Sequence, residues 1–249
     1  MLPANFLDRP IAHRAYHDIA AGRPENSVEA VIAAIEAGYG IEIDLQLSSD
    51  GVAMVFHDDD LDRLTAETGP LRARSAAALG AIPLRHGSKG IPTFAEVLAL
   101  VAGQVPLLVE IKDQDGAMGP DVGTLEAAAV EALKGYAGPV ALMSFNPHSV
   151  AALARLAPDI PRGITTCAYW AADAGTLPEA RLEDLRAIAD FDRTGACFIS
   201  HDWRDLTAPR VTELRAAGVP VLCWTVRSPE DEAAARAVAH NITFEGYPA

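Results

Sequence analysis

Aromatic residues, cysteines and basic residues are all scarce in this sequence. Phe, Trp and Tyr make up 6% of the 249 residues while half of the chain is hydrophobic, so the core must consist mainly of Ala, Val, Leu and Ile. The three cysteines, Cys167, Cys197 and Cys223, are odd in number and show no Cys-x-x-Cys spacing. A disulfide framework is therefore not expected, and a reducing compartment suits the chain.

Acidic side chains outnumber basic ones. Lys and Arg total 20 and Asp and Glu total 34, which gives a net charge of −14. Such a chain lacks the positive surface that binds nucleic acid or an anionic membrane, although a few cations in one pocket could still hold a phosphate. No apolar run reaches the roughly 20 residues of a membrane-spanning helix, and the N-terminal stretch does not resemble a signal peptide. We therefore expect a soluble cytoplasmic protein without nucleic-acid or membrane partners, and the composition does not indicate an oligomeric state.

Short β-rich runs alternate along the chain with Ala-rich helical runs. Eight segments are predicted as strands: 10–15, 40–47, 106–112, 139–145, 160–167, 196–200, 219–226 and 241–244. Seven helical segments lie between them: 27–38, 93–103, 124–136, 147–157, 179–190, 208–218 and 228–240. A terminal Gly38 supports the first helix, and a capping box of Thr93 and Glu96 supports the second. This α/β order predicts a TIM (β/α)8 barrel whose last helix is missing or replaced by the N-terminal segment.

One region interrupts this alternation. Residues 51–60 predict a further strand that ends at His57, and residues 61–92 are rich in turn-forming residues with one short Ala-rich segment. We interpret about 59–92 as a small insertion after the second strand that lies over the mouth of the barrel, where inserted loops shape sites. The predicted organisation is one domain that spans 1–249.

Carboxylates stand inside two of the apolar strands. Glu42 and Asp44 flank an Ile in the second strand, so both side chains point to one face. Glu110 and Lys112 have the same spacing in the next barrel strand. An isolated buried charge is very costly, so three converging carboxylates suit one divalent cation with oxygen ligands, Mg²⁺ or Ca²⁺. The alternatives are ion pairs of Glu42 and Asp44 with arginines, and of Lys112 with Glu110.

Two histidines stand where apolar segments end. His13 is followed by Arg14, and His57 is followed by Asp58. Two imidazoles across a phosphate can act as general base and general acid, because imidazole titrates near neutral pH. Arg14 and Lys112 could neutralise the phosphoryl oxygens. The alternatives are that His13 is a core histidine with satisfied hydrogen bonds and that Arg14 is a structural ion-pair partner.

The other polar residues near these segments have simpler interpretations. The acidic run Asp58–Asp60 is expected to be solvated, and Asn26 or Ser27 to cap a helix, while Glu25 could reach the site. The remaining histidines are interpreted as surface or loop residues, with His17 as the strongest exception: His17, His86, His148, His201 and His240.

Taken together, the motifs resemble those of the glycerophosphodiester phosphodiesterase family. The matching segments are HRA at 13–15, PENS at 24–27, IEIDLQLSSDGVAMVFHDDDLDRLTAETGPL at 41–71, IPTFAEVL at 91–98, LLVEIK at 107–112, SF at 144–145 and WTV at 224–226. The most specific part is the step of 13 residues from Asp44 to His57, followed by Asp and Leu-x-Arg-x-Thr.

This resemblance implies a TIM barrel with one bound divalent cation, Mg²⁺ or Ca²⁺, that hydrolyses small glycerophosphodiesters to glycerol 3-phosphate and an alcohol. The residues that match functional positions of the family are His13 and His57 as the catalytic pair, Arg14 and Lys112 at the substrate phosphate, Glu42, Asp44 and Glu110 as metal ligands, and Phe145 and Trp224 in the pocket. The alternatives are the same chemistry on a lysophospholipid or a glycerol-phosphate polymer, and an inactive binding barrel.

The sequence departs from the family pattern at several positions. The Gly that usually follows His-Arg is Ala15, the Thr of Pro-Glu-Asn-Thr is Ser27, and the Asn that follows Trp-Thr-Val is Arg227. The closing Thr-Asp-x-Pro is represented by TFEGYP at 243–248. None of these changes removes a proposed catalytic group, but they leave the substrate's alcohol unidentified.

Overall fold

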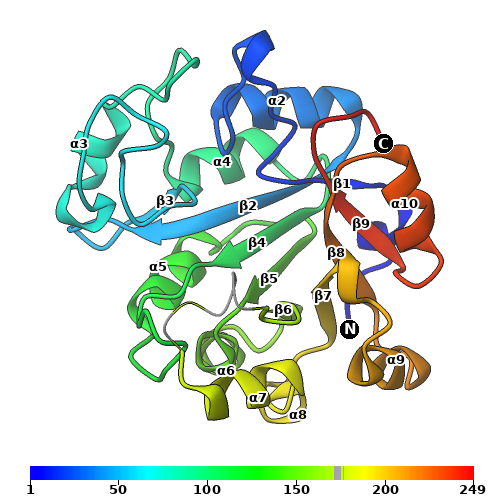
Figure 1. Ribbon diagram of the computed structural model, residues 1–249. Helices are drawn as coiled ribbons and strands as arrows, with labels where there is room; N and C mark the ends of the chain where they lie inside the picture. Colours follow the sequence, from blue (N-terminus) through cyan, green and yellow to red (C-terminus); the bar gives the residue numbers. More distant parts are fainter. Residues whose placement is uncertain (171–174, 176) are drawn as a thin grey trace.

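The computed structural model of the chain describes residues 1–170, 175 and 177–249 (Figure 1). Within this part, eight parallel strands form the barrel: β1 (Ile11–Ala12), β2 (Gly40–Leu47), β4 (Leu107–Ile111), β5 (Val140–Ser144), β6 (Arg162–Thr166), β7 (Phe198–Asp202), β8 (Val221–Val226) and β9 (Asn241–Phe244). Because β1 pairs with both β2 and β9, the sheet is closed. The predicted TIM barrel is confirmed.

Helices connect successive barrel strands and cover the outside of the sheet (Figure 1). They are α2 (Val28–Ala37), α4 (Phe94–Val101), α5 (Thr124–Ala132), α6 (Pro147–Leu156), α7 (Glu179–Arg186), α8 (Phe191–Thr194), α9 (Pro209–Ala216) and α10 (Pro229–Arg236). The predicted helix ends are confirmed for two elements: Gly38 ends α2 in a left-handed conformation, and Thr93 with Glu96 forms the capping box of α4. Among the described residues, no helix has the length and apolar character needed to cross a lipid bilayer.

The first strand is shorter than predicted. Only Ile11–Ala12 is extended, rather than 10–15, because the chain turns after His13. Arg14 and Ala15 have φ values of 52° and 64°, in the left-handed region. This conformation costs a residue with a Cβ atom roughly 1–2 kcal/mol, so Gly would suit position 15 better than Ala15 does. This turn places the side chains of residues 13 and 14 at the carboxyl end of the barrel.

Residues 53–92, which comprise the predicted insertion at about 59–92 and the strand before it, form a small inserted lobe beyond the carboxyl end of β2 (Figure 1). Its strand β3 (Ala53–Val55) pairs antiparallel with β2. The strand ends two residues before His57, the residue at which the sequence predicted its end. The lobe also contains helix α3 (Ala76–Gly80). Its buried residues form a separate apolar cluster: Met54, Phe56, Leu61, Leu64, Leu71, Leu79, Ile82, Leu84 and Ile91. The lobe therefore has a core that can hold His57 and the residues after it in place.

The N-terminal segment closes the opposite end of the barrel. Helix α1 (Asn5–Asp8) presents Phe6, which is fully buried, to the barrel interior. The cluster around this ring includes residues from five barrel strands: Ile11, Leu108, Ala141, Met143, Phe198 and Leu222. The side chain of Asn241 donates hydrogen bonds to the carbonyl oxygens of Phe6 and Arg9, at 2.7 and 2.6 Å. The segment thus plugs the barrel rather than replacing the missing helix.

The C-terminal tail packs between α10 and the end of α2. The Tyr247 hydroxyl donates to Glu232 of α10 at 3.0 Å, and the Tyr39 hydroxyl, just after α2, donates to the carbonyl oxygen of Ala249 at 2.9 Å. Phe244 lies edge-on between the rings of Tyr39 and Tyr247. Aromatic packing therefore protects this part of the sheet from solvent.

We expect Phe6→Ala to lower the free energy of unfolding by about 3–5 kcal/mol, because it leaves a cavity in the barrel interior that the surrounding strands cannot fill. Urea or thermal unfolding of the full chain measures the change. Leu156→Ala is the control, since Leu156 is 45% exposed and should change stability by no more than about 0.5 kcal/mol. Equal effects of the two substitutions would show that α1 does not stabilise the barrel.

Candidate active site

Three carboxylates from two neighbouring strands meet at the carboxyl end of the barrel. The register of β2 and β4 places Asp44 directly beside Glu110, and Glu42 lies two residues before Asp44 on the same face. The three side chains are buried, and each contributes an oxygen that lies within 4.8 Å of the others. The i, i+2 spacing read from the sequence and the parallel register together produce this convergence.

The local electrostatics are those of a crowded anionic cluster. Burial and the charges of Asp44 and Glu110 raise the pKa of Glu42 well above its usual value. Burial also opposes ionisation of Asp44, but Lys112, His57 and Arg14 outweigh it and hold the pKa of Asp44 below its usual range. Asp44 is therefore a carboxylate with cationic partners, whereas ionisation of Glu42 is disfavoured.

Lys112 lies among these acids. Its Nζ atom is 2.8 Å from Glu110 Oε1, 3.6 Å from Asp44 Oδ1 and 3.2 Å from His57 Nε2. Burial lowers the pKa of Lys112, but the charges of Glu110 and Asp44 dominate and raise it, so the side chain is an ammonium ion. The ion pair with Glu110, one of the alternatives read from the sequence, is present, and it places the ammonium group at the cavity.

Asn26 has a larger role than helix capping. Ser27 caps α2 by accepting from the Ala30 N–H at 3.1 Å. Asn26 instead is fully buried, and its Nδ2 donates to Asp44 Oδ2 at 2.9 Å. Of the two residues expected to cap the helix, Ser27 is therefore the cap, and the side chain of Asn26 instead fixes the orientation of the Asp44 carboxylate. The Arg14 backbone N–H similarly donates to Glu42 Oε2 at 2.9 Å.

The three carboxylates could hold a divalent cation. The donor atoms are all hard oxygens, which suits Mg²⁺ or Ca²⁺ rather than a soft metal. A cation there would relieve the repulsion that raises the pKa of Glu42. Partners outside the cluster already orient two of the ligands, as metal sites require.

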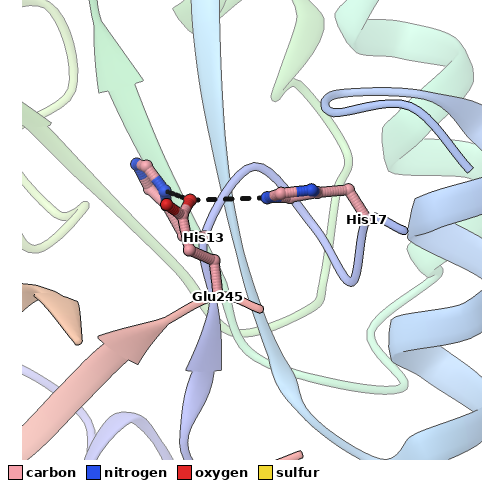
Figure 2. Close-up of side chains that lie close together, drawn as sticks. All are labelled: His13, His17 and Glu245. Carbon is pink, nitrogen blue, oxygen red and sulfur yellow. Dashed lines mark hydrogen bonds and ion pairs between the residues drawn. The ribbon is translucent and has the colours of Figure 1, made fainter. Parts of the chain in front are cut away.

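His13 is held by a carboxylate that the sequence reading did not assign. Glu245 follows the last strand, and its Oε2 atom lies 2.5 Å from His13 Nδ1. Figure 2 shows the Glu245 carboxylate between the rings of His13 and His17, whose Nε2 is 3.4 Å away. The available signal was a carboxylate directly after a barrel strand, in the segment that departs from the family's closing motif. His17 therefore lies at the site, in line with its treatment as an exception.

His57 has an equivalent partner on the other side of the site. Asp58 Oδ1 lies 2.7 Å from His57 Nδ1, and Arg63 donates to both oxygens of Asp58. Arg63 also donates to Glu25, which accepts from Arg14 at 2.6 Å. The expectation that Asp58 is only a solvated member of an acidic run is wrong. A continuous chain of ion pairs links the inserted lobe to the residue after His13.

The two histidines of the catalytic pair, the three acids, Arg14 and Lys112 line one cavity of about 150 Å³ at the barrel mouth. The rings of Phe145 and Trp224 form one wall and meet edge to face with centroids 5.4 Å apart. A neighbouring cavity of about 360 Å³ shares the side chains of His57 and Lys112 and opens beside Asp59. The first cavity is lined by every site residue named in the sequence analysis: His13, Arg14, Glu42, Asp44, His57, Glu110, Lys112, Phe145 and Trp224.

Another histidine differs from its interpretation. His201 was expected on the surface or in a loop, but it lies in β7 and is 2% exposed. Its Nδ1 is 2.7 Å from Thr166 Oγ1, and its Nε2 is 3.2 Å from Asp205. It is a core histidine with satisfied hydrogen bonds.

A TIM barrel that gathers two imidazoles, two cationic side chains and three carboxylates around one cavity has the groups that hydrolysis of a phosphoric diester requires. Residues 13–242 match the model of the family described as the glycerophosphoryl diester phosphodiesterase family. The chain belongs to this family, and its enzyme class is glycerophosphodiester phosphodiesterase.

Individual relatives agree with this assignment. The glycerophosphodiester phosphodiesterase of Caldanaerobacter subterraneus is 32% identical over 164 residues, which cover 62% of this chain and 65% of that protein. The Bacillus subtilis protein YhdW is 26% identical over 248 residues, which cover 96% of this chain and 94% of that protein. Among solved structures, an Oleispira antarctica phosphodiesterase in complex with the product sn-glycerol-3-phosphate has a TM-score of 0.79 and 25% identity, with coverage of 98% of this chain and 94% of that one.

Proposed function

We propose that this protein hydrolyses small glycerophosphodiesters to glycerol 3-phosphate and an alcohol. The observation that carries the proposal is the pair of imidazoles, each held at Nδ1 by a carboxylate, that line one cavity with three buried acids. The product bound by the Oleispira antarctica relative is the product proposed here. We further propose that residues 1–249 act as one domain, since the inserted lobe supplies His57 to the barrel site.

Glu42, Asp44 and Glu110 would hold one divalent cation, Mg²⁺ or Ca²⁺. When bound, such an ion supplies a positive charge that stabilises phosphoryl oxygens. Arg14 and Lys112 are placed to neutralise the same group, because both line the cavity and both carry charge at neutral pH. Phe145 and Trp224 would contact the carbon skeleton of the glycerol moiety.

We assign His13 as the general base and His57 as the general acid. Burial lowers the pKa of His13, against the opposing hydrogen bond from Glu245, so its neutral form is favoured. His57 is the more exposed of the two, at 29% against 14%, and borders the neighbouring cavity through which an alcohol can leave. His13 Nε2 takes the proton of the nucleophile, which is water or the glycerol hydroxyl of the substrate. If the hydroxyl attacks, the first product is a cyclic phosphate, which water then opens to glycerol 3-phosphate. As the P–O bond to the alcohol breaks, His57 donates a proton to the departing oxygen.

Hydrolysis of glycerophosphocholine tests this proposal. We expect release of glycerol 3-phosphate, and EDTA should lower the rate by about 100-fold or more, because metal stabilisation of charge is worth several kcal/mol. Addition of Mg²⁺ or Ca²⁺ in excess should restore it. A panel with other glycerophosphodiesters, a lysophospholipid and a glycerol-phosphate polymer identifies the alcohol. Turnover of none of the glycerophosphodiesters by metal-loaded protein would overturn the proposal.

A further inference from the structure

Glu245 is the only described carboxylate that contacts two histidines of the site, and it has a third partner. Its Oε2 atom faces His13 Nδ1 at 2.5 Å and His17 Nε2 at 3.4 Å, on opposite sides of the carboxylate (Figure 2). Its Oε1 atom accepts from Arg227 Nε at 2.7 Å. Both oxygens of the Glu245 carboxylate are therefore engaged.

The Glu245 contact fixes which nitrogen of His13 carries the proton. Burial opposes ionisation of Glu245, but His13, His17 and Arg227 outweigh it and hold the pKa of Glu245 below its usual range. An ionised carboxylate can only accept hydrogen bonds, so His13 Nδ1 must donate. In neutral His13 the other nitrogen, Nε2, then has a free lone pair for the cavity.

Two departures from the family pattern meet at this contact. Arg227 stands where Trp-Thr-Val is usually followed by Asn, and Glu245 lies in the segment that stands for Thr-Asp-x-Pro. Glutamate has one more rotatable bond than aspartate, so its carboxylate needs more support to stay in one position. Arg227 supplies support from the end of β8, and His17 supplies it from the loop after β1.

We propose that His17 and Arg227 are positioning residues that hold Glu245 against His13, and that Glu245 sets the tautomer His13 needs to act as a base. This inference rests on the proposed function, because it assumes that His13 takes the proton of the nucleophile. It assigns a role to three residues outside the predicted catalytic set, of which Arg227 lines the cavity and His17 and Glu245 do not.

Other charges also face His13. Arg14 is next to it in sequence and lowers its pKa, whereas Asp44 on β2 raises it. Neither contacts Glu245 by a hydrogen bond or ion pair within the described residues. Removal of the Glu245 charge should therefore leave the effects of Arg14 and Asp44 in place, and any change in the titration of His13 reports on Glu245.

The first test replaces the carboxylate. Glu245→Gln should lower kcat on the order of 100-fold or more with little change in KM, because an amide can donate to Nδ1 and stabilise the wrong tautomer. In the parent, the Glu245 anion raises the pKa of His13. Its removal should lower that pKa and so move the acid limb of the kcat/KM profile to lower pH. Parent-like kcat and pH dependence would overturn the proposal.

The second test separates hydrogen-bond support of the Glu245 carboxylate from simple side-chain packing. His17→Leu removes the donor and should lower kcat about tenfold, whereas His17→Gln keeps a donor and should recover most of that loss. Equal loss in both variants would indicate packing and overturn the role of His17. Arg227→Asn alone should lower kcat. In the double variant Arg227→Asn/Glu245→Asp it should add little to the loss of kcat caused by Glu245→Asp, because the two residues are coupled. Additive effects would overturn the role of Arg227.

Nitrogen NMR of His13 in the full chain with Mg²⁺ distinguishes failure of this inference from failure of the proposed function. A protonated Nδ1 in the parent and a shift toward protonated Nε2 in Glu245→Gln support the positioning role, even if no glycerophosphodiester is hydrolysed. A protonated Nε2 in the neutral parent overturns it, even if the enzyme is active.

Discussion

His57→Asn is expected to reduce kcat for glycerophosphocholine by about 10²–10⁴-fold, because the alkoxide that leaves would no longer receive a proton. The variant keeps a side chain of similar size near Asp58 but cannot transfer a proton. Metal binding should persist, since His57 is not one of the three clustered carboxylates. Steady-state kinetics and metal-induced thermal stabilisation measure the two properties on the same protein.

The leaving group makes this prediction specific. A glycerol 3-phosphate ester of p-nitrophenol needs little protonation as it leaves, so His57→Asn should lose much less activity on it, whereas His13→Asn should be impaired on both substrates. His86→Asn is the matched control, because His86 is exposed in the inserted lobe. Equal losses on the two esters would contradict the role of His57 as the acid, and parent-like activity would remove it from catalysis.

Glu42→Gln is expected to abolish stabilisation by Mg²⁺ or Ca²⁺ without destabilising the metal-free protein. The parent should gain about 2.7 kcal/mol of stability when the metal is at 100 times its dissociation constant. The variant loses a ligand charge, yet its amide oxygen can still accept from the Arg14 N–H. It also removes a buried carboxyl group whose ionisation is opposed by Asp44 and Glu110, so the metal-free form should be as stable as the parent or more so.

Thermal unfolding with and without metal separates these effects. Glu126→Gln is the control, because Glu126 is 1% exposed but lies on α5, outside the cluster. It should cost stability and still allow the metal-induced rise. An unchanged rise in Glu42→Gln would mean that Glu42 is not a ligand, and the proposed cation site would then be wrong.

Each histidine of the catalytic pair is held by a carboxylate that lies outside the two strands that carry the acids. Glu245 holds His13 from the end of β9, and Asp58 holds His57 from the inserted lobe. Arg63 extends the second arrangement to Glu25 and so to Arg14. The lobe is therefore part of the site and not only a cover over it, which explains why its Leu-x-Arg-x-Thr motif resembles the family so specifically.

The sequence alone indicated the barrel, the order of its elements and the main acidic and basic residues of the cavity, whereas Phe145 and Trp224 were implied only by the family resemblance. Those inferences depend on local chemistry: alternation in strands, helix caps and the i, i+2 spacing of acids in apolar segments act over a few residues. The strand at 10–15 was too long because the left-handed turn at Arg14 and Ala15 leaves no mark in a hydrophobic pattern.

Only the tertiary structure decided which charge meets which. Glu245 is 232 residues from His13 in the chain, and they meet because closure of the barrel places β9 beside β1. Asn26 contacts Asp44 and Lys112 contacts His57 because pairing of β2 with its neighbouring strands brings separate loops to the same end of the barrel. Partner choice depends on distances between separate elements, and a linear pattern does not contain those distances until the sheet closes.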